Sequence, residues 1–282
     1  MLSHFIKAGR LNRKILVERE IRRAAELIVD SKYAVALTGA GISTPSGIPD
    51  FRSPGTGLWE RFDPMSVASI FAFNLHPLAF YEWARPFGEA LLKAKPNPAH
   101  YALAELEEMK LLSAVITQNI DGLHQKAGSK RVLEVHGHIR EATCLKCHKV
   151  VPLEEEALER FVKRGEVPHC QCGGILKPNV VLFGEELPRR VLLEAWGEAE
   201  NCDLMLVAGS SLEVAPASEI PLVAKRYGAR LIITNYQPTP LDAQAEVVIH
   251  GDVAEVLPRM VEECRKALHR RLRGTNEGGG ER

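Results

Sequence analysis

The chain has 282 residues, enough for one large domain or two smaller ones with a substantial buried core. Its 36 basic and 36 acidic side chains cancel, so no global field draws it onto nucleic acid or an anionic membrane. No apolar stretch is long enough to cross a bilayer, and the segment before Glu20 lacks the continuous apolar core of a secretory signal. We therefore expect a cytoplasmic protein.

Helical patterns and short apolar runs alternate along most of the chain, which is typical of an α/β fold. Aromatic residues and prolines interleave over 60–95 and predict short packed helices. The other expected elements are helices over 14–31, 98–112, 188–200, 216–227 and 253–272, and strands at 33–38, 114–117, 204–208, 230–234 and 247–249.

A glycine-rich segment follows the first expected strand. Gly39 and Gly41 fit the start of the dinucleotide-binding fingerprint, but Thr44 stands where its third glycine belongs. Glycines at this position let backbone N–H groups approach a pyrophosphate. The segment predicts a phosphate-bearing nucleotide held by something other than an ordinary dehydrogenase turn.

Small and amide residues follow five of the expected strands. Ligands of open parallel sheets bind beyond the carboxyl ends of the strands, so this placement predicts a nucleotide crevice. The residues are Gly39 to Gly41, Gln118 with Asn119, Gly209 to Ser211, Asn235, and Gly251 with Asp252.

Two further polar groups could carry chemistry, although each has a simpler structural interpretation. Asn119 and Asp121 could bind a ribose or a carboxamide, or they could only cap the next helix. His136 precedes a glycine and could accept a proton near neutral pH, but His124 or His138 could equally be the reactive histidine.

Four of the six cysteines form two close pairs, at Cys144 with Cys147 and at Cys170 with Cys172. This spacing fits a structural zinc site with four thiolate ligands and no open position, whereas disulfides are the alternative in an oxidising compartment. Cys202 and Cys264 lie alone in apolar contexts and are expected to be small buried side chains.

From about residue 20 to 265, the blocks GAGIST, SGIPDFR, TQNIDGLH, LEVHG, KPNVVLFGE, GSSLEVAP and ITN occur in unbroken order around the paired cysteines. Together they resemble the sirtuin family of NAD-dependent protein-lysine deacylases. The resemblance implies a Rossmann-like large domain over 14–58, 96–139 and 177–272. A helical module at 59–95 and a zinc-binding module at 140–176 would form the small domain, and 1–13 and 273–282 would be flexible ends.

The resemblance also assigns roles to individual residues. His136 would be the general base, assisted by Asn119, and the four paired cysteines would hold Zn²⁺. An acyl-peptide would add as a strand along Val181, Phe183, Gly184, Glu213 and Val214. NAD would be bound by Gly39, Ala40, Gly41, Ser43, Asp50, Phe51, Arg52, Gln118, Asn119, Ile120, Asp121, Gly209, Ser210, Ser211, Asn235, Tyr236, Gln237 and Val253.

In the implied reaction, the acyl oxygen of an acyl-lysine attacks C1′ of the nicotinamide ribose and displaces nicotinamide. The base then removes a proton from a ribose hydroxyl, which attacks the resulting imidate, and water completes the reaction to free lysine and O-acyl-ADP-ribose. The partners would be acetyl-lysine proteins or peptides. The protein itself would be a monomer that binds neither nucleic acid nor a membrane. Mono-ADP-ribosylation, or an idle NAD-binding protein on the same fold, are the alternatives.

The acyl group can also be inferred from the resemblance. Sirtuins that prefer succinyl or malonyl groups carry a Tyr and an Arg in the helical insertion, and the aligned positions are Ala84 and Phe87, with Arg85 close by. We therefore expect acetyl and longer apolar acyl groups, with poor removal of succinyl.

Overall fold

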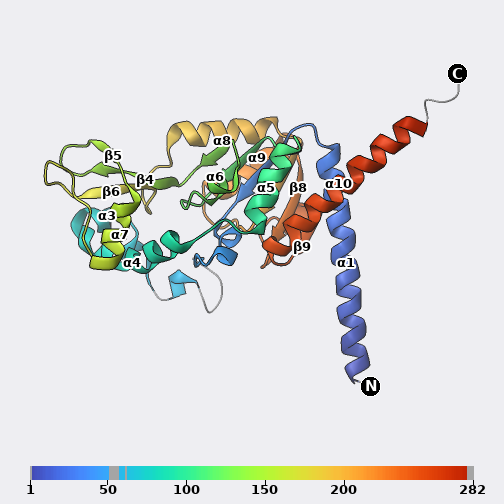
Figure 1. The fold of residues 1–282 in the computed structure, drawn as a ribbon, viewed down its shortest axis with the longest axis horizontal. Helices are drawn as coiled ribbons and strands as arrows, with labels where there is room; N and C mark the ends of the chain where they lie inside the picture. The colour runs from blue at the N-terminus through green and yellow to red at the C-terminus, as the bar shows by residue number, and fades with distance from the viewer. Residues whose placement is uncertain (1, 51–56, 61, 278–282) are drawn as a thin grey trace.

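A six-stranded parallel sheet forms the centre of the computed structural model, which describes residues 2–50, 57–60 and 62–277 (Figure 1). The order β3-β2-β1-β7-β8-β9 reverses direction between β1 and β7, as in dinucleotide-binding sheets. The strands are β1 Ala34–Thr38, β2 Ala114–Thr117, β3 Val132–Glu134, β7 Leu204–Ala208, β8 Arg230–Asn235 and β9 Val247–His250. The expected parallel α/β fold is confirmed, and β3, which we did not predict, adds one edge strand.

Helices cover both faces of this sheet, because alternate residues of each strand point to opposite sides. On β1, Ala36 faces one apolar cluster and Leu37 faces the other. The first cluster is built with α1 Leu2–Asp30, α5 Pro98–Glu108 and α10 Val253–Glu277, and the second with α8 Arg189–Asn201 and α9 Ile220–Arg226.

The two terminal helices are longer than the sequence pattern indicated. Helix α1 begins at Leu2 rather than near residue 14, and α10 continues past Gly274 to Glu277. Both project from the body of the molecule (Figure 1). Residues 2–13 and 273–277, which we expected to be flexible ends, are therefore continuous with helices. Among the described residues, no helix combines the length and the apolar character needed to cross a bilayer.

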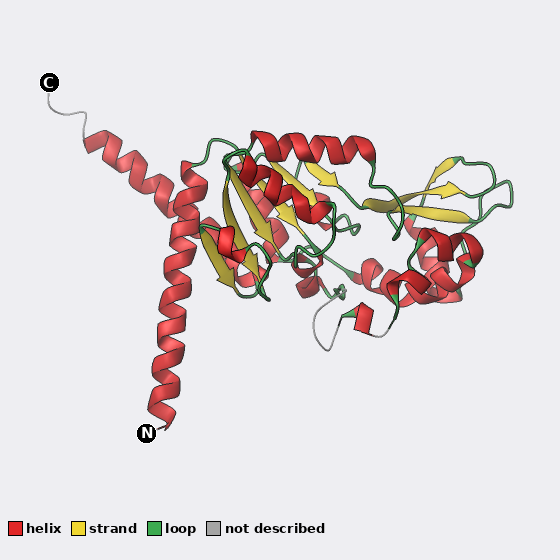
Figure 2. Ribbon diagram, turned by 180° about the vertical axis from the view of Figure 1, so that it is seen from behind, coloured by secondary structure: helices red, strands yellow, loops and turns green. Residues whose placement is uncertain are grey.

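A smaller unit lies beside the sheet and combines a helical and an antiparallel part (Figure 2). Phe73, Phe80, Tyr81 and Phe161 pack into one buried cluster that joins the two parts. The helical part contains α2 Pro64–Val67, α3 Ile70–Leu75 and α4 Pro77–Lys93; the other contains β4 Gly137–Cys144, β5 Val150–Pro152, α7 Glu155–Arg164 and β6 Leu176–Val180. Its strand order is β5-β4-β6. The short helices of 60–95 had been predicted, and 140–176 had been predicted as a zinc-ribbon module, but without the bounds of its strands and of α7.

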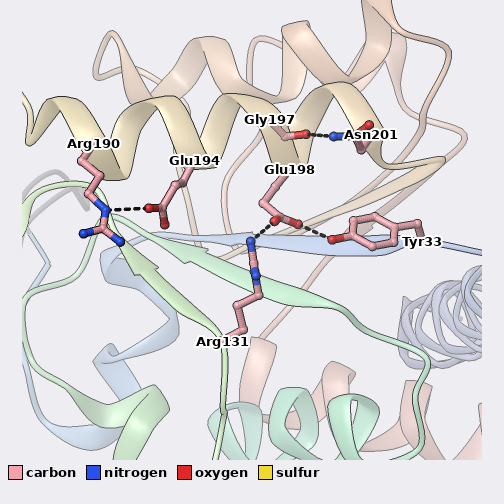
Figure 3. A network of polar contacts seen from close by, with 7 residues as sticks. All are labelled: Tyr33, Arg131, Arg190, Glu194, Gly197, Glu198 and Asn201. Atoms are coloured by element: carbon pink, nitrogen blue, oxygen red, sulfur yellow. Dashed lines mark hydrogen bonds and ion pairs between the residues drawn. The ribbon is translucent and has the colours of Figure 1, made fainter.

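A network of polar contacts lies at the amino end of the large sheet (Figure 3). Glu198 of α8 is 6% exposed, and it accepts hydrogen bonds from Arg131, which precedes β3, and from the Tyr33 hydroxyl at 2.8 Å. Because Tyr33 precedes β1, this one carboxylate ties a covering helix to two strands.

Candidate functional site

The loops after β1 and β7 meet at the point where the strand order reverses. The Gly41 N–H donates to the Gly209 carbonyl at 2.8 Å, and a Cβ on Gly41 would lie 2.9 Å from the same oxygen. Gly209 has φ +63°, and a Cβ there would lie 2.3 Å from the nitrogen of Ile42. The glycines are thus required by the contact between the two loops, in addition to any ligand.

Ser43 is the centre of a buried polar cluster at this edge. It lies between the two short 3₁₀ turns Ala40–Ile42 and Thr44–Ser46. Its hydroxyl donates to Oδ2 of Asp121 at 2.7 Å and accepts from Nδ2 of Asn119 at 3.0 Å. Asn119 also donates to the Gly39 carbonyl at 3.0 Å. The structure therefore brings together three residues that the resemblance had assigned to the nicotinamide end of the cofactor.

His100 is a fourth member of the cluster, and the sequence analysis missed it. Its Nδ1 accepts the Asn97 N–H at 3.3 Å, so Nε2 carries the proton and donates to Ser43 Oγ at 3.4 Å. Burial lowers the pKa of His100 to about 4, which keeps the ring neutral. The available signal was a histidine three residues before Leu103, on the apolar side of helix α5.

Asp121 is a buried carboxylate held by neutral donors. Its Oδ1 accepts the N–H of Leu123, at the start of α6 Leu123–Ala127, at 2.8 Å, while Oδ2 accepts the Ser43 hydroxyl. The alternative of a capping role is thus correct for one oxygen only. Burial raises the pKa of Asp121, although both hydrogen bonds oppose the shift.

His136 leaves the carboxyl end of β3 and approaches Gln118, which follows β2. Its Nδ1 lies 3.0 Å from the Gln118 carbonyl, and because a carbonyl can only accept, Nδ1 carries the proton. In the neutral form of the ring, this tautomer places the lone pair on Nε2, the nitrogen that would take a proton. Gln118 itself donates from Nε2 to Ser210 Oγ at 2.9 Å, which links the loops after β2 and β7.

The other two candidate histidines are less suited to accept a proton from a ligand. His124 is 1% exposed, and its Nε2 lies 2.9 Å from Thr38 Oγ1. His138 is oriented toward Glu141, with 3.9 Å between Nε2 and the nearer carboxylate oxygen. Of the three, His136 combines a half-buried ring with a hydrogen bond to the backbone of Gln118.

Other residues predicted to bind NAD lie after β7, at the end of β8 and after β9. Asn235 ends β8 and donates from Nδ2 to the Gln237 carbonyl at 2.8 Å, and Val253 begins α10. Tyr236 is 73% exposed, whereas Ser210 is 4% exposed. Ser211 and Ile120 are partly buried, as are Ala40 and Asp50. Phe51 and Arg52 lie outside the described residues.

The segment predicted to bind peptide follows β6. The Val181 N–H donates to the His136 carbonyl at 2.9 Å, so this segment is fixed directly to the candidate base. The Phe183 N–H already donates to Ala68, and its carbonyl accepts from Ile70. Backbone pairing with a peptide would therefore fall on the Val181 carbonyl and on Gly184, not on the Val181 N–H. Glu213 and Val214, assigned to the opposite side, lie in the loop between β7 and α9.

The four paired cysteines converge on one point, and their ligand atoms all lie within 4.8 Å of one another. Cys144 Sγ lies 3.5 Å from Cys172 Sγ, and Cys147 Sγ lies 3.8 Å from Cys170 Sγ. A tetrahedral zinc with Zn–S bonds of about 2.3 Å requires sulfur separations of about 3.8 Å. The residues therefore fit a four-thiolate zinc.

The surroundings of the sulfurs agree with this assignment. A Cβ on Gly174 would lie 2.6 Å from Cys144 Sγ, so the tight C-x-C corner requires a glycine. Backbone N–H groups, first that of Cys147, lower the pKa of Cys144 to about 6. His169, which precedes Cys170 in the sequence, directs Nδ1 to the Val167 carbonyl and not to the sulfurs. Cys202 and Cys264 are buried, as expected, and burial raises the pKa of each to about 12.

Comparisons with known proteins agree with the geometry. The sequence model of the Sir2 family matches residues 39–216. A protein of Archaeoglobus fulgidus named NAD-dependent protein deacylase 2 is 53% identical over 89% of this chain and 98% of its own length. A protein of Sulfolobus acidocaldarius named NAD-dependent protein deacetylase is 49% identical over 90% of this chain and 98% of its own length.

Solved structures are similar over the same span. A structure described as the basis for the mechanism and regulation of Sir2 enzymes has a TM-score of 0.84 and 52% identity, and covers 89% of this chain and 99% of its own. Sir2Af2 bound to a myristoylated histone peptide has a TM-score of 0.78 and 47% identity, covering 90% and 99%. A Sir2 complex with a p53 peptide and NAD⁺ has a TM-score of 0.76 and 46% identity, covering 84% and 95%.

Proposed function

Because this chain belongs to the Sir2 family, the sirtuins, we propose that it is an NAD-dependent protein-lysine deacetylase. It cleaves nicotinamide from NAD and transfers the acyl group to ADP-ribose, releasing free lysine. The observation that carries this proposal is the buried cluster of Ser43, Asn119 and Asp121 at the carboxyl edge of a dinucleotide-type sheet, together with His136 hydrogen-bonded to Gln118 at the same edge.

His136, Asp121 and Asn119 have different roles in the proposed reaction. Nε2 of His136 takes a proton from a ribose hydroxyl, and the proton on Nδ1 remains with the Gln118 carbonyl, which holds the ring in the required tautomer. Asp121 and Asn119 bind the carboxamide and ribose at the nicotinamide end. Their rigid neutral hydrogen bonds create preorganised surroundings for the positive charge that develops when nicotinamide leaves.

NAD extends from this cluster across the reversal point between β1 and β7. Gly39, Ala40 and Gly41 support the phosphates, and Ser210, Ser211, Asn235 and the start of α10 support the adenosine half. The zinc takes no chemical part, since four thiolates leave no position for a substrate. It stabilises the fold of the smaller unit instead.

The preferred acyl group is acetyl or a longer apolar chain. Phe87 packs in an apolar cluster with Ile48 and Leu123, and Ala84 packs against the aromatic cluster of the smaller unit. Arg85, the nearby cation, donates from Nε to the Val162 carbonyl at 2.7 Å and from Nη2 to Lys163 at 3.3 Å. These two hydrogen bonds hold its guanidinium at the end of α7, and we propose that it does not reach a succinyl group.

The substrates are acetylated proteins or peptides that add as a strand along Val181 and Gly184, with Glu213 and Val214 on the other side. This mode of recognition uses backbone hydrogen bonds and tolerates many sequences. It suits a chain of balanced charge, which we propose acts as a cytoplasmic monomer without nucleic acid.

Mass spectrometry of the products from NAD and an acetylated peptide tests the proposal. We expect nicotinamide, O-acetyl-ADP-ribose and free lysine in equal amounts, and no nicotinamide without the acetyl group. Transfer of label from NAD to protein would support mono-ADP-ribosylation instead, and the absence of both products would indicate an idle NAD-binding protein. Faster removal of succinyl than of acetyl would refute the acyl preference alone.

A further inference from the structure

A series of buried hydrogen bonds connects Asn119 to Thr117, Thr38 and His124, three residues with no role in the proposed reaction so far. Thr38 ends β1 and is 0% exposed, and Thr117 ends the neighbouring strand β2 and is 2% exposed. The two residues are directly paired across the parallel strands. The Thr38 hydroxyl donates to Thr117 Oγ1 at 2.8 Å, and Thr117 Oγ1 accepts the backbone N–H of Asn119 at 3.1 Å.

His124 of α6 lies at the other end of this series of hydrogen bonds. Having donated its only proton, Thr38 Oγ1 must accept from Nε2 of His124, 2.9 Å away. His124 Nδ1 then carries no proton, and it is buried without a hydrogen-bond partner among the described residues. Burial, together with the neighbouring His100, lowers the pKa of His124 to about 3, so the ring keeps this neutral form at neutral pH.

Asn119 is thus held from two sides. Its side chain is fixed by the Gly39 carbonyl and the Ser43 hydroxyl, and its backbone is fixed by Thr117. These bonds use both Nδ2 protons, which leaves Oδ1 as the acceptor that can order a ribose hydroxyl or a water. The direction of Oδ1 depends on the backbone orientation of Asn119, and that orientation depends on the buried series of hydrogen bonds.

We propose that His124, Thr38 and Thr117 are positioning residues for the NAD-cleaving reaction, acting as a relay that fixes the backbone of Asn119 and aims its Oδ1. This inference rests on the proposed function. The three side chains are 0 to 2% exposed, and none of them is assigned to the binding of NAD or peptide. Loss of the relay should therefore lower turnover while leaving the affinity for the acyl-peptide unchanged, because small misplacements of a catalytic group are costly.

The test compares two variants at one position with a matched control. Thr117→Val replaces the hydroxyl by a methyl group of similar size, whereas Thr117→Ser keeps it. Thr234, which precedes the last residue of β8, is also 0% exposed, but its Oγ1 has no hydrogen-bond partner among the described residues. Thr234→Val therefore makes the same change in the same sheet without breaking a hydrogen bond.

We expect Thr117→Val to lower kcat for nicotinamide release about tenfold, from the loss of about one hydrogen bond's worth of positioning energy, with KM for acetyl-peptide unchanged. Thr117→Ser should retain most of the activity, and Thr234→Val all of it. Thr117→Val should have the lower thermal unfolding midpoint of the two valine variants, because it leaves two buried groups unpaired, so kcat is compared per folded molecule at a temperature below both midpoints. His124→Leu should reproduce the kcat loss where it folds.

Three outcomes would overturn the proposal. Equal kcat in Thr117→Val and Thr234→Val would show that the hydroxyl does not position Asn119. A rise in peptide KM at constant kcat would place the effect on substrate binding. A loss in Thr117→Ser equal to that in Thr117→Val would point to packing. An inactive wild-type protein would instead refute the proposed function itself, so the two failures are distinguishable.

Discussion

The two ends of the central sheet each bury a carboxylate, but they satisfy it in different ways. At the amino end, Glu198 accepts from the guanidinium of Arg131 and from the Tyr33 hydroxyl (Figure 3). At the carboxyl end, Asp121 accepts from a serine hydroxyl and a backbone N–H, and it forms no ion pair with the described residues. Both are almost fully buried, at 6% and 8% exposure.

The difference separates a structural carboxylate from a functional one. A cation beside a buried carboxylate offsets the cost of removing its charge from water. Neutral donors offset less of that cost, as the raised pKa of Asp121 shows. Among the described residues, this carboxyl with a raised pKa lies at the edge where we propose that NAD binds, which agrees with the tendency of perturbed pKa values to cluster at functional sites.

The largest expected effect comes from removing the proposed base at the carboxyl end. His136→Ala should lower the rate of deacetylation about a thousandfold, since a positioned general base contributes about 10²- to 10⁴-fold. The ring is half-buried and donates a hydrogen bond to one backbone carbonyl, so the thermal unfolding midpoint should fall by only a few degrees. Steady-state kinetics and calorimetry on the same preparation would check both expectations.

A zinc-site variant serves as the control for this prediction. Cys144→Ser removes one of the four thiolates, and because metal binding is coupled to folding, it should release zinc and destabilise the protein. Retained turnover in His136→Ala would mean that another group is the base. Tight zinc binding by Cys144→Ser would argue against four thiolate ligands.

The next largest effect is expected from the buried carboxylate at the carboxyl end of the sheet. Asp121→Asn should lower kcat/KM for NAD about a hundredfold. Each carboxylate oxygen now accepts one hydrogen bond, and the amide nitrogen that replaces one oxygen cannot accept, so the side chain loses one bond and its fixed orientation. The pKa of Asp121 is raised from its ordinary value of 3.8, so its contribution to stability is fully present below that pH and is lost as pH rises through the folded pKa. Asn does not titrate.

The difference in stability between Asp121→Asn and the wild type should consequently change with pH. Relative to the wild type, Asp121→Asn should gain free energy of unfolding as the pH rises from about 4 to 7, a change opposite in sign to its loss of activity. Urea unfolding at several pH values measures this slope. A difference that is constant or shrinks with rising pH would show that burial does not raise the pKa of this carboxyl.

The sequence predicted the parallel sheet well because its strands are buried on both faces. Leu204–Ala208 and Ala114–Thr117 are continuous apolar or β-branched runs, and their bounds were found without error. Strand β4 instead carries polar residues such as Arg140 and Glu141, so it has no comparable signal and was missed, as were its antiparallel partners.

The candidate site was predictable only in part. The polar residues after each strand could be placed at one edge, but local patterns do not reveal which side chains meet across 78 residues, as Ser43 and Asp121 do. His100 and Thr38 were missed for a related reason, because buried polar groups in a helix and a strand resemble ordinary core positions until their partners are known. The resemblance to the sirtuins supplied what spacing could not.

The smallest effect belongs to the amino end. Glu198→Gln should lower the free energy of unfolding by about 2 kcal/mol, since it weakens two hydrogen bonds to a buried charged group, while turnover per folded molecule stays unchanged. One helix turn earlier in Figure 3, Arg190 and Glu194 form an exposed pair at 2.9 Å, with the Arg190 side chain 91% exposed.

This exposed pair provides the matched control on the same helix. Arg190→Ala should cost only about 0.3 kcal/mol, because solvent screens a surface i,i+4 pair. Measuring both variants by urea unfolding and by nicotinamide release tests whether the amino end is purely structural. If Glu198→Gln slowed catalysis at full folding, the two ends of the sheet would be coupled. A buried carboxylate with a cation would then not be a reliable mark of a structural role in this fold.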